Sequence, residues 1–314
     1  MQLTPLVSVL ICTRNRADEL IHALRSVLAN DYGSFTVSVV DQSDNDDTRK
    51  IVEQCQVECG GRVAVRYIRT DTRGLGFARN VALAEATGEV VAFTDDDCWV
   101  PTDWVAKIAA LFLADPKLMM LYGQVLMPDE YVGDPSLVVP CLHFDTHREI
   151  KKGTIFGMAA NMAFRKQIIS VIGKYDVVLG AGGAFGGGED FDFTYRAQTA
   201  GLKIVAEPTL TVIHKSFRTR DRWKDVLCSY GQGDAAFYSK HARCGDGWAR
   251  QTIWKKIVRS LLRGVVRAIC GRAAADQWSY LKGFRDGLRR SRGYMVDISH
   301  RLYIAADTPV KAKA

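Results

Sequence analysis

The sequence predicts an α/β protein built on a mostly parallel sheet flanked by helices, followed by a C-terminal helical segment. Short apolar runs alternate with segments whose apolar residues recur at helical spacing, a pattern typical of parallel strands joined by crossover helices. Beyond residue 221 the pattern is almost wholly helical. The 314 residues are 47% hydrophobic and 25% charged, which excludes a collagen, a coiled coil and a wholly disordered chain.

Four strands are predicted within the first hundred residues, at 7–12, 35–40, 63–68 and 90–93. Helices are expected between them, and polar or acidic clusters directly follow the first, second and fourth strands. Parallel sheets bind ligands beyond the carboxyl ends of their strands. We therefore expect these clusters to meet at one edge of the sheet.

The second half of the chain carries weaker signals. We expect helices at 101–113 and 191–200, and short extended runs at 203–205 and 209–214. The segment Gly180–Gly188 holds six glycines in nine residues, so we expect it to be too flexible to form part of a core.

The net charge of +7 is spread unevenly. Residues 240–314 hold 17 Lys and Arg against 5 Asp and Glu, so the rest of the chain is mildly acidic. This asymmetry predicts a C-terminal region that meets an anionic partner. The eight cysteines show no paired spacing, and no apolar run approaches the roughly 18–20 residues of a membrane span. We therefore expect reduced, buried thiols and a cytoplasmic location, with peripheral membrane contact as a further option.

The acidic triplet Asp95-Asp96-Asp97 directly follows an apolar strand. Adjacent carboxylates repel one another unless something compensates their charge. Hard divalent cations take oxygen ligands, and Mg²⁺ is commonly held by one or two carboxylates together with substrate phosphates. A solvated acidic turn would give the same tripeptide, but its position at a strand end favours a cation site.

Five motifs occur in a fixed order along the chain. They are Val7-Ser-Val-Leu-Ile-Cys-Thr-Arg-Asn-Arg16, Val39-Val-Asp-Gln-Ser-Asp44, Gly74-Leu-Gly-Phe-Ala-Arg-Asn80, Phe93-Thr-Asp-Asp-Asp97 and Gly188-Glu-Asp190. Together they resemble glycosyltransferase family 2, the inverting GT-A enzymes that use nucleotide-diphosphate sugars. The resemblance implies a GT-A domain at 1–220, with a nucleotide-binding half at 1–100 and an acceptor half at 101–220. Residues 221–314 would form a basic, mainly helical region.

The resemblance also implies a role for each motif residue. A carboxylate at Asp41 suits the imide N–H of a pyrimidine base, and the planar guanidinium of Arg79 suits phosphate oxygens. The residues expected to bind the nucleotide sugar are Thr13, Arg14, Asn15, Asp41, Arg79, Asp95 and Asp96.

The metal ligands implied by the resemblance are Asp97 first, then Asp95 and His214, holding Mg²⁺ or Mn²⁺. A one-residue shift of the motif would make Asp96 a ligand instead. His214 follows the extended run at 209–213, where a surface histidine would look the same.

Inverting transfer needs one carboxylate to accept the proton of the acceptor hydroxyl. The resemblance implies Asp190 as that general base, with Glu189 as the second choice. We expect Asp95, Asp97 and Asp190 to share one pocket, although two acids at a helix N-terminus could also serve the helix dipole alone.

The C-terminal region contains the most regular amphipathic pattern, at residues 253–269. Apolar pairs and single basic residues both recur every four positions, and a second basic cluster follows at 285–292. Such a helix suits an anionic membrane surface, here assigned to 250–292. It could equally pack on the protein's own body, whereas no nucleic-acid-binding motif is present.

The sequence therefore predicts a metal-dependent inverting glycosyltransferase that uses a nucleotide-diphosphate sugar and a glycan or lipid-linked acceptor, in cell-surface polysaccharide or glycolipid synthesis. Two alternatives remain. One is a nucleotidyltransferase on a similar α/β scaffold. The other is a non-catalytic, membrane-attached scaffold of the same fold.

Overall fold

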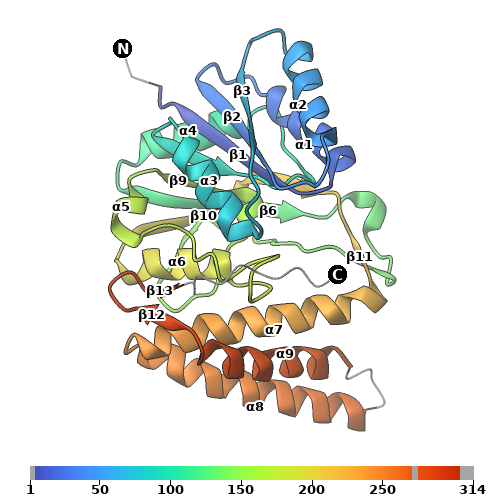
Figure 1. Cartoon of the computed structure of the whole chain (residues 1–314), viewed down its shortest axis with the longest axis vertical. Helices are drawn as coiled ribbons and strands as arrows, with labels where there is room; N and C mark the ends of the chain where they lie inside the picture. Colours follow the sequence, from blue (N-terminus) through green and yellow to red (C-terminus); the bar gives the residue numbers. More distant parts are fainter. Residues whose placement is uncertain (1–3, 271–274, 305–314) are drawn as a thin grey trace. The chain divides into compact units, whose positions relative to one another are not determined.

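The computed structural model describes residues 4–270 and 275–304, which form two compact units (Figure 1). The first unit contains residues 1–73, 77–174 and 193–220, and the second contains 74–76, 175–192 and 221–314. Of the predicted basic C-terminal region, residues 271–274 and 305–314 lie outside the described residues.

The first unit is built on a nine-stranded sheet. Its strand order is β3-β2-β1-β4-β9-β6-β10-β5, and β8 pairs with β10 off this path. The neighbours from β3 to β4 are parallel, as are β6 and β10, whereas β9 is antiparallel to both of its neighbours. The predicted mostly parallel sheet is thus confirmed. The strands are β1 (Val7–Thr13), β2 (Phe35–Asp41), β3 (Ala64–Arg69), β4 (Val90–Phe93), β5 (Cys98–Trp99), β6 (Leu118–Leu126), β8 (Arg148–Glu149), β9 (Met162–Arg165) and β10 (Lys203–His214).

The carboxyl ends of three neighbouring strands meet at one edge of this sheet, as expected. In the register of β1 and β2, Thr13 lies opposite Asp41. On the other side of β1, Leu10 lies opposite Phe93, the last residue of β4. The polar clusters after these strands therefore occupy adjacent positions.

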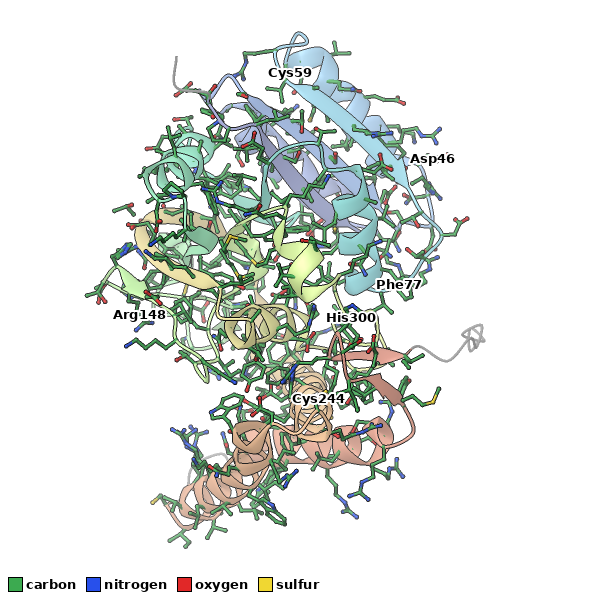
Figure 2. The ribbon with its side chains drawn as sticks, turned by 90° about the vertical axis from the view of Figure 1, so that its left-hand side faces the viewer. Asp46, Cys59, Phe77, Arg148, Cys244 and His300 are labelled. Atoms are coloured by element: carbon green, nitrogen blue, oxygen red, sulfur yellow. The ribbon has the colours of Figure 1, made fainter. Side chains whose placement is uncertain are left out.

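Helices cover both faces of the sheet. Alternate β1 residues, including Val9 and Ile11, pack with Leu24 of α1 in one core, where all three are 0% exposed. On the opposite face the ring of Phe164 lies 5.2 Å from that of Phe193 in α6. The helices are α1 (Ala17–Leu28), α2 (Asp47–Glu58), α3 (Leu75–Glu85), α4 (Trp104–Ala114), α5 (Ile168–Ile172) and α6 (Glu189–Thr199). Figure 2 labels Asp46 and Cys59, the residues that flank α2.

Two central strands, β6 and β9, have no counterpart among the predicted elements. The two extended runs predicted at 203–205 and 209–214 are one strand, β10, whose pairing with β6 is irregular between Ala206 and Thr211. Short elements complete this unit: the strands β7 (Leu137–Val138) and β11 (Arg218–Thr219), which pair with each other, and the 3-10 helices η1 (Asp129–Tyr131) and η2 (Ala159–Asn161).

The second unit contains the helices α7 (Arg220–Arg243), α8 (Gly247–Ile269) and α9 (Ala275–Ser291), with a hairpin of β12 (Met295–Asp297) and β13 (Leu302–Ile304). Glycines let α7 and α9 cross closely, because a Cβ at Gly283 would overlap the carbonyl oxygen of Cys228. Within the described ranges, none of the helices has the length and apolar content needed to cross a bilayer.

The glycine-rich segment is packed, so the expectation that it is too flexible for a core is wrong. Leu179 and Phe185 are both 0% exposed and belong to a hydrophobic cluster of the second unit. Gly188 has φ +89°, and a Cβ at Gly186 would lie 2.7 Å from the Cβ of Ser229 in α7. The glycines here permit close packing of backbone on helix.

The cysteines are all free. Cys55 and Cys98 are buried, but Cys141 and Cys270 are exposed, so the expectation of buried thiols holds for only part of the set.

Candidate metal and nucleotide site

The acidic triplet occupies the tight connection between β4 and β5. Cys98 of β5 lies opposite His214 of β10 in an antiparallel register. The amide N–H of Lys215 donates to the carbonyl oxygen of Asp97 at 2.9 Å. The pairing of β5 with β10 thereby brings a histidine from more than a hundred residues away to the triplet.

His214 and Asp97 form the core of a candidate metal site. The Nε2 atom of His214 lies 3.5 Å from Oδ1 of Asp97, and both side chains are buried. Its other nitrogen, Nδ1, lies 2.9 Å from the carbonyl oxygen of Ser216 and must donate to it. In the neutral ring Nε2 is then a lone-pair acceptor that faces a carboxylate oxygen, an arrangement that a cation between them would stabilise.

Cys98 is the third group of this cluster. One potential ligand atom from each of Asp97, Cys98 and His214 lies within 4.8 Å of the others. Burial raises the pKa of the Cys98 thiol well above its ordinary value, so the sulfur stays protonated. The fitting ligands are therefore the carboxylate, which suits Mn²⁺ or Mg²⁺, and the imidazole, which favours Mn²⁺ over Mg²⁺.

Asp96 points into the protein and is held by two donors. Its carboxylate accepts from Thr13 Oγ1 at 2.7 Å and from the Arg16 guanidinium at 2.8 Å. Burial raises the pKa of Asp96 to about 7, against the opposing charge of Arg16. Burial acts to raise the pKa of Asp97, but the charge of Arg16 and the hydrogen bonds with Arg16 and Ser216 outweigh it and lower the pKa of that carboxyl. Asp97 is thus the better cation ligand of the two.

Asp95 and Arg79 lie together beside this cluster. The side chain of Asp95 is 39% exposed, and its Oδ1 lies 4.0 Å from a guanidinium nitrogen of Arg79. Arg79 is buried over the ring of Phe93. The exposed carboxylate and the buried guanidinium share the edge at which a nucleotide diphosphate is expected.

Arg16 is a site residue that sequence reasoning missed. Its guanidinium donates to Asp96 and Asp97, at 2.8 Å each, and to Ser216 Oγ at 2.6 Å. Arg14, the arginine predicted to bind the nucleotide sugar, is half-exposed and lies 3.7 Å from Asp44. The left-handed backbone of Asn15, with φ +55°, redirects the chain between the two arginines. The motif Thr13-Arg-Asn-Arg16 contains two arginines, and the residue pattern alone does not show which of them faces the acids. The turn at Asn15 decides this.

The end of β2 is tied to the end of β1. Asp41 is fully buried and accepts from the amide of Ser43 at 2.8 Å and from the Tyr67 hydroxyl at 2.7 Å. Asn15 exchanges two hydrogen bonds of 2.9 Å with Asp44. The expected base-binding carboxylate is thus fixed in place by neighbouring strands.

Glu189 and Asp190 open helix α6 and belong to the second unit. Glu189 is buried, and a Cβ at Gly180 would lie 2.9 Å from its carboxyl carbon, so the glycine makes room for this acid. Asp190 is half-buried in the first turn. The placement of Asp190 beside Asp95 and Asp97 stays a prediction.

A second buried group of charges was not foreseen. Lys240 of α7 donates to Asp176 Oδ2 at 2.5 Å and lies 2.6 Å from Asp192 Oδ1. His241 donates from Nε2 to the same Asp192 oxygen at 2.9 Å, and all four side chains are 0% exposed. A lysine inside a long helix is usually solvated, so its burial could not be predicted from the residue pattern.

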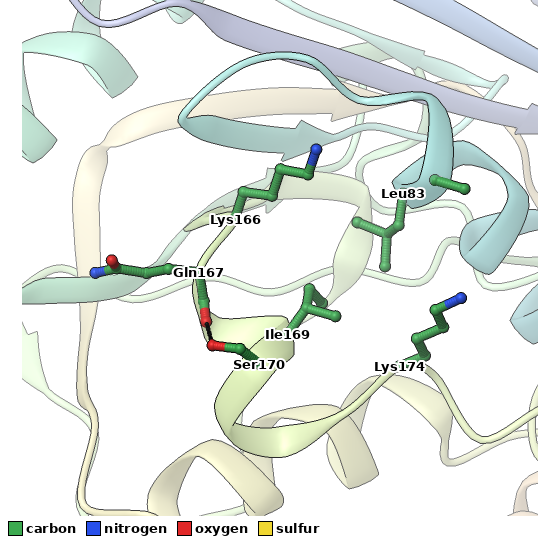
Figure 3. A pocket seen from close by; sticks show the side chains of 7 residues that line it. Leu83, Lys166, Gln167, Ile169, Ser170 and Lys174 are labelled. Carbon is green, nitrogen blue, oxygen red and sulfur yellow. Dashed lines mark hydrogen bonds between the residues drawn. The ribbon is translucent and has the colours of Figure 1, made fainter.

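Figure 3 shows a pocket of about 500 Å³ between α3 and α5. Leu83, Lys166, Ile169 and Lys174 line it, and none of the predicted site residues does. This pocket therefore has no part in the site formed by the acidic triplet.

Residues 8–173 match the family described as Glycosyl transferase family 2. The chain belongs to glycosyltransferase family 2. The match includes Thr13, Asp41, Arg79 and the acidic triplet, while His214 and Asp190 lie beyond it.

Two relatives of this family 2 glycosyltransferase are named for their reaction or their biosynthetic product. It is 25% identical to a glucosyl-dolichyl phosphate glucuronosyltransferase of Haloferax volcanii, over 74% of this chain and 76% of the relative. It is 28% identical to the succinoglycan biosynthesis protein ExoM of Rhizobium meliloti, over 64% of each. Across these and one further relative, the chain spans 54 to 76% of the relative's own length.

A solved structure confirms the GT-A fold. A mannosyltransferase of Pyrobaculum calidifontis, solved in complex with GDP-Man and Mn²⁺, superposes with a TM-score of 0.60. The match covers 93% of this chain and 87% of the mannosyltransferase at 18% identity.

Proposed function

We propose that this protein transfers a sugar, with inversion, from a nucleotide-diphosphate sugar to an acceptor hydroxyl, with Mg²⁺ or Mn²⁺ bound at Asp97 and His214. The proposal rests above all on the His214 imidazole, whose Nδ1 donates to Ser216 while Nε2 faces Asp97. A divalent cation would satisfy both acceptors at once. Asp95, half-exposed at the same edge, would bind the cation through water or hold the ribose.

The donor nucleotide would bind along the ends of β1 and β2. Asp41 would accept from the base, and Thr13 and Asn15 would border it. Arg79 and Arg14 would face the diphosphate, since guanidinium groups pair with phosphate oxygens in a planar fork. The mannosyltransferase of the same fold was solved with GDP-Man and Mn²⁺, which supports a nucleotide-sugar donor and a divalent metal.

The transfer is a single displacement at the anomeric carbon. The acceptor oxygen attacks that carbon, its proton passes to Asp190 or, as second choice, Glu189, and the bond to the diphosphate oxygen breaks with its electron pair leaving on the diphosphate. The bound cation would stabilise the charge that develops on the leaving group.

The acceptor would be a glycan or a lipid-linked sugar of cell-surface polysaccharide or glycolipid synthesis. The Haloferax relative is named for a glucosyl-dolichyl phosphate acceptor, and the Rhizobium relative for succinoglycan, which support the two classes.

The test is product analysis with a series of nucleotide sugars and Mn²⁺. We expect release of a nucleoside diphosphate, loss of turnover with a chelator or with Asp97→Ala, and an inverted anomeric configuration by NMR. Release of pyrophosphate would instead indicate a nucleotidyltransferase. Absence of turnover with every donor would indicate a non-catalytic scaffold, and either result overturns the proposal.

A further inference from the structure

Helix α8 turns most of its large apolar side chains outward, whereas its fully buried residues are small. The buried residues of α8 are Ala249, Ser260 and Gly264. Gly264 lies against α9, where an added Cβ would come within 2.8 Å of the Trp278 ring. Small residues therefore let α8 pack closely on its neighbour, and of its large apolar side chains only Trp248, Ile253 and Ile257 are partly buried.

Seven large apolar side chains form an outer stripe along α8, each between 45 and 80% exposed. Their spacing of three and four residues places them on one face of the helix. Soluble proteins rarely expose so continuous an apolar surface unless it binds something. The outer stripe consists of Trp254, Val258, Leu261, Leu262, Val265, Val266 and Ile269.

A basic row borders the outer stripe on one side. Lys255, Arg259, Arg263 and Arg267 recur every four residues and are exposed. Because each residue of an α-helix is rotated by about 100° from the previous one, the basic row lies beside the outer stripe, between it and the buried face of α8. Apolar area with cations beside it matches the boundary between lipid headgroups and acyl chains.

A cavity of about 580 Å³ adjoins the N-terminal end of the outer stripe. Arg243, Arg250 and Arg292 line it together with Ile253 and Trp254, and Trp254 is shared with the outer stripe. A lining that combines arginines with apolar side chains suits a phosphate headgroup whose acyl chains continue along the helix.

We infer that α8 docks on an anionic phospholipid surface, with the outer stripe in the headgroup–acyl boundary, the basic row on lipid phosphates and the cavity around one headgroup. A second copy of the chain is the competing occupant. Symmetric pairing of two outer stripes would bring two basic rows into one interface, where like charges oppose each other. The inference is independent of the metal site and of the proposed reaction.

The test is co-sedimentation of the full chain with vesicles of phosphatidylglycerol or of phosphatidylcholine. We expect binding to the anionic vesicles that weakens in high salt. The variant Leu262→Asp/Val266→Asp should lose it, whereas Val57→Asp, at an even more exposed apolar position of α2, should bind like the unmodified chain. The variant Arg259→Gln/Arg263→Gln should bind the anionic vesicles about 25-fold more weakly, because each arginine charge removed should lower the affinity about fivefold.

Lys151→Gln/Lys152→Gln removes the same charge from an exposed loop of the first unit and serves as the matched control. Sedimentation velocity follows the same variants without lipid. Equal loss in both charge variants would show non-specific attraction, and equal binding to both vesicle types would remove the anionic requirement. A dimer that Leu262→Asp/Val266→Asp dissociates, without vesicle binding by the unmodified chain, would assign the outer stripe to a second copy. Each of these results overturns the inference.

Discussion

Each unit holds a buried group of charges, and the two groups differ in access and in balance. The acid cluster of the first unit comprises Asp96, Asp97, Arg16 and His214, and the side chain of Arg16 is 29% exposed. The lysine cluster of the second unit comprises Lys240, Asp176, Asp192 and His241, all 0% exposed.

The balance of donors and acceptors separates them further. In the lysine cluster the contacts of Lys240 and His241 with the two carboxylates each join a donor to an acceptor, and the Tyr303 amide also donates to Asp176 at 2.9 Å. In the acid cluster, the lone pair of His214 faces that of Asp97. A fully buried group in which donors and acceptors are paired stabilises the fold. A solvent-accessible group in which two acceptors face each other is suited to bind a cation.

The largest effect should come from the lysine cluster. Lys240→Met leaves two carboxylates buried without their cation, so we expect the free energy of unfolding to fall by about 3–5 kcal/mol in urea titrations. Lys50→Met, which breaks the exposed pair with Asp47, should cost less than about 1 kcal/mol. If both variants lose the same small amount, the lysine cluster is not a structural centre.

The next effect concerns the acid cluster. Asp97→Asn removes the charged ligand, so we expect Mn²⁺ affinity to fall at least about 100-fold, beyond what loss of an outer-shell partner costs. Isothermal titration with Mn²⁺ measures it. The same titration on Asp44→Asn, an exposed acid outside the cluster, should match the unmodified protein. Unchanged Mn²⁺ binding by Asp97→Asn would contradict the assigned site.

The pH dependence of stability sharpens the contrast. Burial lowers the pKa of His241 to about 4, against the opposing charge of Asp192. Between pH 4 and 6.5 the unfolded chain binds more protons than the folded one, so stability is complete above about pH 6.5 and is lost as the pH falls. We expect a contribution of about 2–3 kcal/mol between pH 7 and 4.5.

His241→Gln should flatten this part of the profile. Urea titrations of the unmodified protein and of His241→Gln between pH 7 and 4.5 measure the free energy of unfolding of each. The difference between the two proteins removes the contribution of the other titrating groups. Parallel profiles would mean that His241 is already protonated in the folded protein.

The smallest effect should have the opposite sign. The Arg16 guanidinium lies 2.8 Å from both Asp96 and Asp97 and competes with any cation there. Arg16→Gln should therefore tighten Mn²⁺ binding in the absence of nucleotide by about fivefold, or about 1 kcal/mol, the upper end of what a solvent-accessible ion pair contributes. Weaker binding by this variant would show that Arg16 supports the metal site instead of balancing it.

Local patterns in the sequence were sufficient for the first hundred residues. The strands β1, β2 and β4 lie where the apolar runs predicted them, because a buried parallel strand needs a short apolar run that ends at polar residues. The central strands β6 and β9 were missed. The run Leu118–Leu126 is apolar apart from Gln124 and suits a buried helix as well, and β9 has only four residues, so their partners in the sheet decide their conformation.

The sequence by itself determined the family, the fold class and the edge of the sheet where the acids gather, since these follow from short-range pattern and order. Only the tertiary structure decided which arginine meets the acids, that His214 turns Nε2 toward Asp97, that Lys240 is sealed inside, and that α8 packs by its small residues. Each of these features depends on contacts between residues that are distant in the sequence. Strand register, one residue with a positive φ, or the space beside one glycine decides which of several similar side chains reaches a given position.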